Sequence, residues 1–376
     1  MNKLIRKAIF LTNKSSVYSA VTGGVQLCSQ EFLEILNAVD NISLEHYYVT
    51  FTKSIWQRIL IKSGFENYSM YDVEKDKEAL VSYIKSNQVE LIFINMASLV
   101  RYAKPIKNAF GEKVKVILMS HGNHSGDFLH LISKPLKPVN RLRLFFNKIR
   151  LGLLISTESL FRVKYLDAVV ALSKTEMQIE NWFGAKSSLF LPRRLAPAFL
   201  SHQPVAGRVG FVGRLDHPPN LQGIEILMEA SSQTADNKIE IRLVGAPESM
   251  GTQLAKKYKQ VNYLGELSDA GLENEVATWS ILLNPVWWYS TGASTKLAKA
   301  ISWGIPIVTT TAGMRGYRWN KGNLLMADTP QQMWTVIHKN ANDIQIINAN
   351  AAQTKIVATS GYEVKELADM LQQLIN

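Results

Sequence analysis

The sequence predicts an α/β protein made of two successive domains, each built on a parallel sheet. The chain has 376 residues, and at roughly 150 residues per domain this length suits two of them. Short apolar runs alternate with longer segments of helical pattern along the whole chain, which is typical of parallel sheets covered by helices on both faces. The net charge of +11 also divides the chain: residues 1–200 hold 27 Lys and Arg against 16 Asp and Glu, whereas the rest hold 15 of each.

The predicted strands of the first domain are five apolar runs, at residues 7–12, 46–51, 90–95, 114–119 and 168–172. Helix-compatible segments such as 26–39 and 75–85 separate them. Five further runs predict the strands of the second domain, at residues 208–212, 239–244, 261–264, 281–284 and 306–310. Helical segments again lie between these runs, for example 220–230 and 295–303.

The boundary between the domains is expected in the stretch 191–205, which has three prolines and no clear period. The first domain is therefore predicted over residues 1–195 and the second over 205–360, and a last helix within 361–376 could pack back onto the first. The resulting fold prediction is two Rossmann-like domains. Because the first half is basic, an anionic membrane surface, an anionic ligand or nucleic acid could each attract it.

The composition excludes several classes of protein. With 47% hydrophobic and 19% charged residues, the chain is neither disordered nor collagen-like. Its one cysteine, Cys28, allows no disulfide within the chain and suits a reducing cytoplasm. No apolar run reaches the ~18 residues of a membrane span, and the apolar stretch that follows the basic start is too short for a signal peptide. We therefore expect a cytoplasmic protein.

Motifs exclude further functions. No Gly-X-Gly-X-X-Gly follows a predicted strand, which argues against a dehydrogenase, and no Gly-Lys-Ser/Thr loop occurs, which argues against a nucleotide triphosphatase. The positive charge would suit nucleic acid, but no recognisable binding module is present, so nucleic acid is not an expected partner.

The segment 134–150 carries six basic residues and predicts an amphipathic helix. On a helical wheel one side is apolar, formed by Leu142, Phe145, Phe146, Ile149 and Leu153. Basic side chains flank that side, namely Arg141, Arg143, Lys148 and Arg150. This pattern is typical of a helix that lies in a lipid headgroup layer. Leu144 and Leu151 fall on the opposite side, so a core helix with a solvated basic edge is the alternative.

Two candidate site features follow strands of the first domain. Gly23 and Gly24 lie in the loop after the first strand, where glycines let backbone amides approach an anion, although a plain turn is equally consistent with them. His121 follows the strand 114–119, at the edge of an open α/β sheet where ligands bind. There it could hydrogen-bond a ligand hydroxyl or act as a general base, and the alternative is a histidine that only packs the loop.

Two further features lie in the second domain. Arg214 follows the strand 208–212, where a guanidinium suits bidentate contact with a diphosphate; a plain surface arginine is the alternative. Small residues from Gly292 to Thr295 precede a helix expected to start at Thr295, and amides at such a start attract phosphate. Lys296 and Lys299 add positive charge there, which is unfavourable unless an anion is bound, or unless both lysines point to water.

The segments FVGRLDHPPN, IRLVGAPE, YLGELSDAGLENEVATWSILLNPV and STGASTKLAKAISWGIPIVTT resemble the nucleotide-sugar-binding half of GT-B glycosyltransferases, and glycosyltransferase family 4 is the nearest group. The first half agrees more loosely, through the Gly-Gly loop and His121. The resemblance implies two Rossmann-like domains that face each other across a cleft. It also implies a nucleotide-diphosphate sugar as donor, and a saccharide or lipid-linked saccharide as acceptor in the first domain.

The resemblance also implies a role for individual residues. Gly23 and Gly24 would approach the donor, and His121 would contact its sugar. Loops at Gly245 and at Leu264 to Glu266 would hold the base and ribose. Residues around the phosphate would hold or neutralise the diphosphate, a set of six: Arg214, Gly292, Ser294, Thr295, Lys296 and Lys299.

Three positions depart from the family pattern. A second basic residue is usual about five positions after the arginine, where this chain has Pro219. Two glutamates eight residues apart are common around the phosphate helix, where this chain has Thr291 and Lys299. These departures leave open the donor base, the donor sugar and whether the anomeric configuration is retained, although the resemblance favours retention.

No Asp-X-Asp pair follows a strand, so we expect neither a metal on the diphosphate nor a further cofactor. The function expected is sugar transfer at the cytoplasmic face of a membrane, in bacterial surface polysaccharide or lipopolysaccharide synthesis. Two alternatives stay open. One is a nucleotide-sugar epimerase or hydrolase on the same fold, and the other is a non-catalytic partner subunit.

Overall fold

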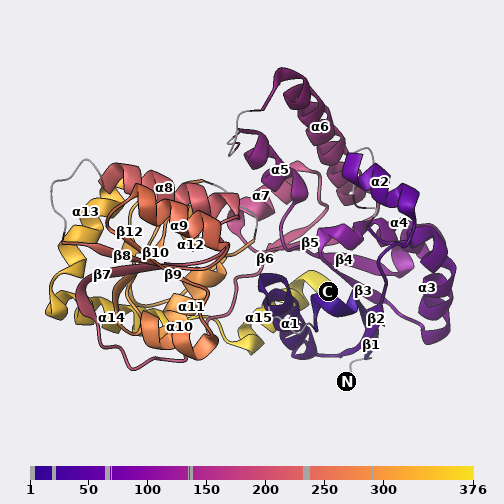
Figure 1. Ribbon diagram of the computed structural model, residues 1–376. Helices are drawn as coiled ribbons and strands as arrows, with labels where there is room; N and C mark the ends of the chain where they lie inside the picture. Colours follow the sequence, from indigo (N-terminus) through magenta and orange to yellow (C-terminus); the bar gives the residue numbers. More distant parts are fainter. Residues whose placement is uncertain are drawn as a thin grey trace. The chain divides into compact units, whose positions relative to one another are not determined.

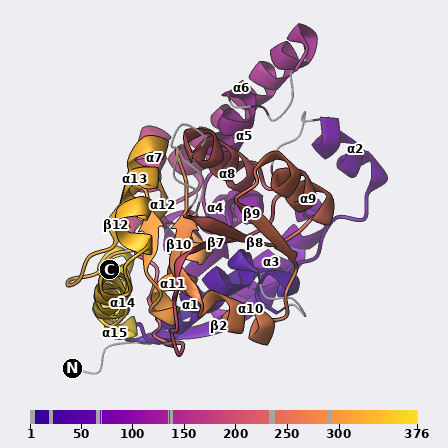
Figure 2. The same cartoon turned by 60° about the vertical axis from the view of Figure 1, so that its left-hand side comes forward.

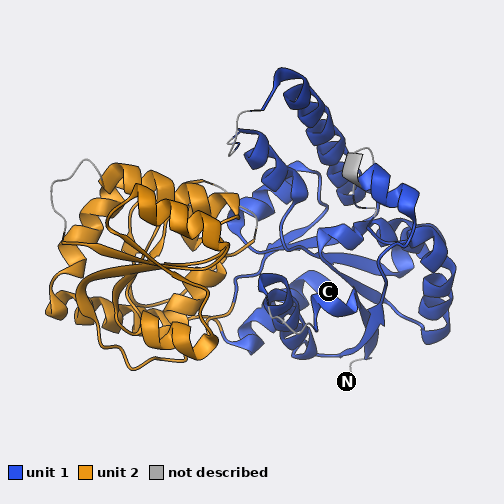
Figure 3. Cartoon of the chain, in the orientation of Figure 1, with its two compact units in different colours: residues 1–193, 363–376 blue, residues 194–362 orange. Residues whose placement is uncertain are grey.

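The computed structural model describes residues 5–18, 23–63, 68, 70–133, 135, 139–231, 238–288 and 292–376 (Figures 1 and 2). The chain divides into two compact units (Figure 3). Unit 1 comprises residues 1–193 and 363–376, and unit 2 comprises residues 194–362. In the described part of the chain each unit contains one six-stranded parallel sheet, which confirms the predicted α/β fold class.

The sheet of unit 1 has the strand order β2-β1-β3-β4-β5-β6. Its strands are β1 (Arg6–Thr12), β2 (Ile42–Tyr48), β3 (Leu91–Asn95), β4 (Lys115–Met119), β5 (Ala168–Ala171) and β6 (Ser188–Phe190). The helices are α1 (Gly24–Asn37), α2 (Ile55–Ser63), α3 (Val73–Asn87), α4 (Ala103–Phe110), α5 (His124–Ser133), α6 (Arg141–Lys164), α7 (Lys174–Trp182) and α15 (Val364–Ile375). Every residue of the central strand β3 is buried, as the unbroken apolar run LIFIN requires of a strand covered on both faces.

Two strand predictions for unit 1 need correction. The second strand is Ile42–Tyr48 and not 46–51, because β2 pairs with β1 in a register that runs from Arg6 opposite Ile42 to Thr12 opposite Tyr48. Phe51 instead forms an isolated antiparallel bridge with Tyr71. The three-residue strand β6 was not predicted, because a run this short has no readable period.

The last helix, α15, belongs to unit 1. Its apolar side is buried at Leu367, Leu371 and Ile375. Lys115 Nζ donates to the carbonyl oxygens of Leu374 and Ile375 at 2.8 and 2.9 Å. These carbonyls have no partner further along the helix, and a cation at a helix C-terminus is favourable, so the contact holds the chain end against β4.

The sheet of unit 2 has the strand order β12-β11-β10-β7-β8-β9. Its strands are β7 (Val205–Val212), β8 (Glu240–Val244), β9 (Val261–Gly265), β10 (Trp279–Asn284), β11 (Ile307–Thr309) and β12 (Leu325–Met326). The helices are α8 (Pro218–Ser231), α9 (Glu248–Lys257), α10 (Asp269–Val276), α11 (Thr295–Trp303), α12 (Thr311–Met314), α13 (Pro330–Ala341) and α14 (Ile344–Ala358). The central pair β7 and β10 is tightly packed, since a Cβ on Gly210 would lie 2.1 Å from the ring of Trp279.

The basic segment forms part of helix α6, which has one buried side and one exposed side. The Asn140 side chain caps it by accepting from the Arg143 amide at 2.7 Å. Its inward side carries the buried residues Leu154, Glu158, Phe161 and Arg162, and Leu144 and Leu151, on the side opposite the predicted apolar face, are partly buried. The predicted apolar face is exposed, from 66% at Leu142 to 42% at Leu153, so this face is not the one that α6 packs against the rest of unit 1.

No helix in the described ranges is long and apolar enough to cross a membrane.

Candidate functional site

The carboxyl ends of β7, β8 and β9 form a compact edge of unit 2. The Gly213 amide donates to Val244 O at 3.0 Å, and the Gly245 amide donates to Gly265 O at 2.9 Å. Gly245 has φ +142°, and a Cβ there would lie 2.0 Å from Gly213 O. Only glycine fits this position, because the backbone after β8 runs directly against the backbone after β7.

Arg214 follows this edge and is exposed, with 70% of its side chain accessible. Its Nε and Nη2 donate to the two carboxylate oxygens of Asp216 at 2.9 and 2.6 Å. These hydrogen bonds raise the pKa of Arg214, and the Glu266 carboxylate adds a smaller effect in the same direction. Asp216 therefore occupies the edge of the guanidinium formed by Nε and Nη2, and a diphosphate that uses this edge would have to replace it as the partner.

Lys296 lies on the first turn of α11 and is partly buried. Its Nζ donates to Asn220 Oδ1 at 2.5 Å and lies 5.0 Å from the ring centre of Phe211. Burial, and then the positive charge of Arg315, lower the pKa of Lys296 to about 8. A cation in this setting is poorly compensated by the protein, so a bound anion would stabilise it.

The Lys296–Asn220 contact lies next to Pro219, the position where the family pattern has a second basic residue. Pro219 lies in the first turn of α8, where a missing amide hydrogen costs nothing. The ammonium of Lys296, on α11, donates to the side chain of the neighbouring residue Asn220. A positive charge is therefore present beside position 219, although α11 supplies it and not α8.

Side-chain hydrogen bonds connect the start of α11 to the end of β10. Ser294 caps the helix by accepting from the Leu297 amide at 3.4 Å, and its hydroxyl donates to Asn284 Oδ1 at 3.2 Å. Asn284 is fully buried and donates to Thr309 Oγ1 at 2.9 Å. The first intrahelical amide is that of Ala298, which donates to Ser294 O. The amides of Thr295 and Lys296 precede it, and amides at this position have no acceptor within the helix, so an anion at the helix start would suit them.

The remaining predicted residues of unit 2 are dispersed around this site. Lys299 is exposed, and its Nζ lies 4.9 Å from the ring centre of Trp303, so it contacts a different surface from Lys296. Leu264 is a partly buried residue of β9 that packs against the core of unit 2, whereas Glu266 is exposed. Gly292 has φ +70°, which suits glycine. Thr291 lies outside the described residues.

Arg315 was missed by the sequence reasoning. It follows the short helix α12, and its Nη1 donates to Ala312 O at 2.7 Å. Its charge is close enough to lower the pKa of Lys296, so the two cations share one electrostatic site. The available signal was its place shortly after the predicted strand 306–310, at the same edge of the sheet.

His121 lies at the end of β4 in unit 1 and is partly buried. Its Nε2 lies 2.8 Å from Asn95 Oδ1. Asn95 Nδ2 donates to Thr12 Oγ1 and Ser29 Oγ, both at 2.9 Å, so Oδ1 must accept. The imidazole therefore carries its proton on Nε2, and Nδ1 is left as an acceptor.

The surroundings of His121 also keep it neutral. Burial, and then the charge of Arg193, lower its pKa to about 3, and the ring of Phe32 packs edge-on at 5.4 Å. A base this weak takes up almost no proton at neutral pH, so the acceptor role suits His121 better than general-base catalysis.

The two glycines of the first loop are only partly available to a ligand. Gly23 is the N-cap of α1, and its amide donates to Gln26 Oε1 at 3.1 Å. Gly24 is exposed as the first residue of the helix. The capping contact with Gln26 already satisfies one amide of this helix start, which favours the turn interpretation for Gly23.

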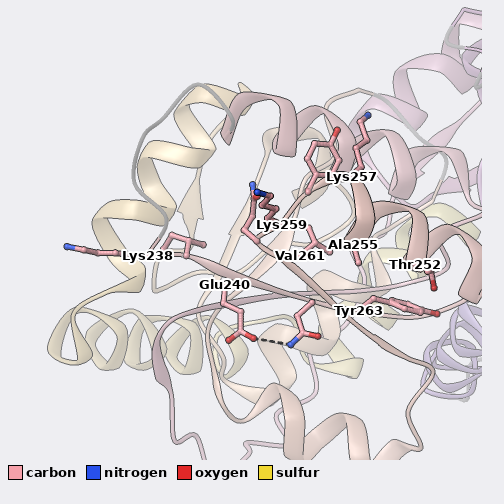
Figure 4. A pocket seen from close by; sticks show the side chains of 12 residues that line it. Lys238, Glu240, Thr252, Ala255, Lys257, Lys259, Val261 and Tyr263 are labelled. Atoms are coloured by element: carbon pink, nitrogen blue, oxygen red, sulfur yellow. Dashed lines mark hydrogen bonds between the residues drawn. The ribbon is translucent and has the colours of Figure 1, made fainter.

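A separate cavity of about 980 Å³ lies at the other end of the same sheet (Figure 4). It is lined by β8, β9 and α9, with Lys238, Lys257 and Lys259 among its walls, and Asn262 donates to Glu240 there at 3.2 Å. None of the predicted site residues lines it. Among the residues that the structure describes, no group of three or more His, Cys, Asp or Glu side chains is arranged to hold a metal ion.

Residues 206–343 match the model of the family described as Glycosyl transferases group 1. This segment contains Arg214, Gly245, Ser294 and Lys296. No curated protein matches the sequence.

Three solved structures illustrate the fold. The lipopolysaccharide outer core galactosyltransferase WaaB has a TM-score of 0.62 and 13% identity, over 98% of this chain and 99% of that one. HepE of Anabaena, in complex with UDP-glucose, has a TM-score of 0.58 and 14% identity over the same shares. TarM has a TM-score of 0.63 and 9% identity over 99% of both chains. At such low identity these matches establish the fold, which is GT-B.

Proposed function

We propose that this chain, a glycosyltransferase by the family match of unit 2 and by its fold, transfers a sugar from a nucleotide-diphosphate donor to a saccharide or lipid-linked saccharide. The observation that carries the proposal is the setting of Lys296. It is a partly buried ammonium at the start of α11, with a second cation nearby and Asn220 as its hydrogen-bond acceptor. A diphosphate at this position would supply the negative charge that the protein lacks there.

In the proposed reaction, negative charge builds on the departing diphosphate as the glycosidic bond breaks. Lys296 and the amides at the start of α11 are placed to stabilise that charge, and Arg214 joins them once it leaves Asp216. Preorganised donors of this kind act most strongly on charge that develops in the transition state. We propose that these cations replace a metal ion on the diphosphate and that the anomeric configuration is retained.

The similar structures support a UDP-sugar as the first donor to test, since HepE was solved with UDP-glucose. WaaB is a lipopolysaccharide galactosyltransferase, which supports the proposed role in bacterial surface polysaccharide or lipopolysaccharide synthesis. We also propose that His121 accepts a hydrogen bond from a hydroxyl of the transferred sugar through Nδ1. Glycines 23 and 24 and Glu266 remain candidate donor contacts.

The acceptor side of the proposal rests on α6. Its exposed apolar face is flanked by Arg141, Arg143, Lys148 and Arg150, and its sequence contains one acid, Glu158, which is buried. We propose that this face lies on the anionic cytoplasmic surface of a membrane, where a lipid-linked acceptor would be found. Neutralising the four basic residues should release the protein from anionic liposomes, and unchanged binding would rule out this face.

The donor proposal is tested by a thermal-shift screen against nucleoside diphosphates and their sugars, because a bound ligand raises the melting temperature by mass action. A donor that stabilises the wild type but neither Lys296→Ala nor Arg214→Ala would support it. Release of free nucleotide without any acceptor would favour a hydrolase. Absence of nucleotide-sugar binding by calorimetry would favour a non-catalytic partner subunit.

A further inference from the structure

Helix α2 carries large apolar side chains that are not buried in the core of unit 1. None of its described side chains, residues 55–61, is buried. Ile55 is 72% exposed and Trp56 is 74% exposed, followed by Ile59 at 49% and Leu60 at 39%. A nine-residue helix is marginal in water unless tertiary packing supports it, and large exposed apolar groups in one place indicate a surface that is covered in use.

Polar contacts hold α2 at its start and leave its apolar face open. Thr52 Oγ1 donates to Gln57 Oε1 at 2.6 Å, and Gln57 Nε2 donates to Tyr71 O at 3.4 Å. The apolar residues Ile55, Trp56 and Ile59 take no part in these bonds. The helix is therefore anchored through Gln57, whereas its largest side chains point to solvent.

Helix α2 belongs to the same surface of unit 1 as α5 and α6. A cavity of about 280 Å³ is lined by Ile61 of α2, by Phe128 and Leu131 of α5, and by Arg150 and Leu154 of α6. A second cavity, of about 750 Å³, brings Gln57 and Leu60 of α2 together with Leu160 and Phe161 of α6. Both views in Figures 1 and 2 show α5 and α6 side by side, extending away from the sheet. We call the exposed side of these helices the three-helix surface.

The charge on the three-helix surface is mainly positive. Lys53 and Arg58 are exposed beside the apolar residues of α2, and no acid occurs between Asp40 and Glu66 except Glu45. Helix α6 contributes Arg141, Arg143, Lys148 and Arg150, which are exposed or partly exposed, and α5 contributes one acid, Asp127. Apolar side chains ringed by cations complement an anionic bilayer, because the former enter the acyl boundary while the latter contact lipid phosphates.

We propose that α2 is a second membrane-inserting element, which places Trp56, Ile55 and Ile59 in the headgroup–acyl boundary of an anionic bilayer beside α6. Trp56 acts as the interfacial anchor, since the indole ring is favoured at that depth. The proposal extends the membrane contact proposed for α6 and does not depend on sugar transfer. In this proposal the two helices contribute different interactions. Helix α6 supplies most of the electrostatic attraction, which salt screens, and α2 supplies apolar insertion, which salt does not weaken.

The experiment measures binding of the full-length protein to vesicles, without donor or acceptor. The probes are phosphatidylcholine vesicles with and without about a third phosphatidylglycerol, at low and at high salt. The test variant is Trp56→Ser with Ile59→Ser. Its matched control is Ile344→Ser with Ile346→Ser on α14 of unit 2, where the side chains are 44% and 37% exposed. The conservative variant Trp56→Phe checks the anchor itself.

The wild type and the control variant should bind anionic vesicles equally and keep part of that binding at high salt. The test variant should partition at least tenfold less and lose its remaining binding at high salt. The separate variant Trp56→Phe should retain most of the wild-type binding. Equal binding of the test variant and the wild type would overturn the proposal, even if neutralising α6 abolishes binding. A concentration-dependent dimer that only the test variant lacks, with no vesicle binding, would also overturn it in favour of self-association.

Discussion

The pKa of Lys296 predicts that donor affinity falls as the pH rises through 8. In the unliganded protein the pKa of this lysine is lowered to about 8, chiefly by burial. Only the protonated ammonium pairs with a diphosphate, so the apparent affinity scales with the protonated fraction. That fraction falls from about 0.9 at pH 7 to about 0.1 at pH 9 for a pKa near 8. We therefore expect the dissociation constant to rise about tenfold between pH 7 and pH 9.

The assay is titration calorimetry with the nucleotide sugar that gives the largest thermal shift, at pH 7, 8 and 9. A nucleotide sugar suits the experiment because its doubly esterified diphosphate does not titrate in this range. Lys296→Arg keeps a permanent charge and should show almost no pH dependence. Lys296→Met should bind weakly at every pH.

A wild-type affinity that stays constant from pH 7 to pH 9 would refute the reasoning, because it would mean that Lys296 has an ordinary pKa or does not contact the donor. Stability gives an independent check. The folded-state pKa lies below that of the unfolded chain, so the unfolded state binds more protons between pH 8 and pH 10.5, and stability should rise with pH across that window. Lys296→Met should raise the stability of the unliganded protein at pH 7 by about 1–2 kcal/mol, after allowance for partial screening.

Three further predictions concern Arg214, His121 and the role of divalent metal ions. Arg214→Ala should lower kcat about 100-fold or more, whereas its melting temperature should stay within a few degrees of the wild type because the side chain is exposed; wild-type turnover would remove Arg214 from the site. The pKa of His121 is lowered to about 3, so its contribution to stability is complete above pH 6.5 and is lost as the pH falls below it. Between pH 7 and pH 4.5 the wild type should lose about 2 kcal/mol more stability than His121→Asn, measured by urea unfolding at each pH, and parallel curves would contradict the buried neutral histidine. Turnover should survive chelation of divalent metal ions by EDTA, and its loss on chelation would indicate a metal-held diphosphate in place of the proposed cations.

The central strands could be predicted because they are buried on both faces. The apolar runs of β3, β4 and β10 stand out against polar neighbours, and each prediction for them agrees with the structure within two residues. Edge strands lack this signal. β2 alternates polar and apolar residues, which gives a weak signal. The more apolar run at 46–51 was therefore predicted as the strand, whereas the strand that pairs with β1 is Ile42–Tyr48. β12 has two residues and could not be recognised at all.

The local part of the candidate site was also readable from the sequence. A helix that starts at Thr295 and carries Lys296 near its start follows from the order of small, polar and apolar residues around that position, and α11 starts at Thr295; the capping role of Ser294 was not predicted. The contact between Lys296 and Asn220 was not predictable. It joins α11 to the start of α8 across 76 residues of sequence, and its geometry depends on how β7 and β10 pair.

The sequence by itself determined the two α/β units, the helix start that carries Lys296 and the amphipathic character of α6, because each depends on the order of neighbouring residues along one element. Tertiary structure alone decided which face of α6 is exposed, that Arg214 pairs with Asp216, and that burial together with Arg315 lowers the pKa of Lys296. The physical reason is that burial and charge proximity are set by packing between elements, and no local pattern specifies which elements will meet.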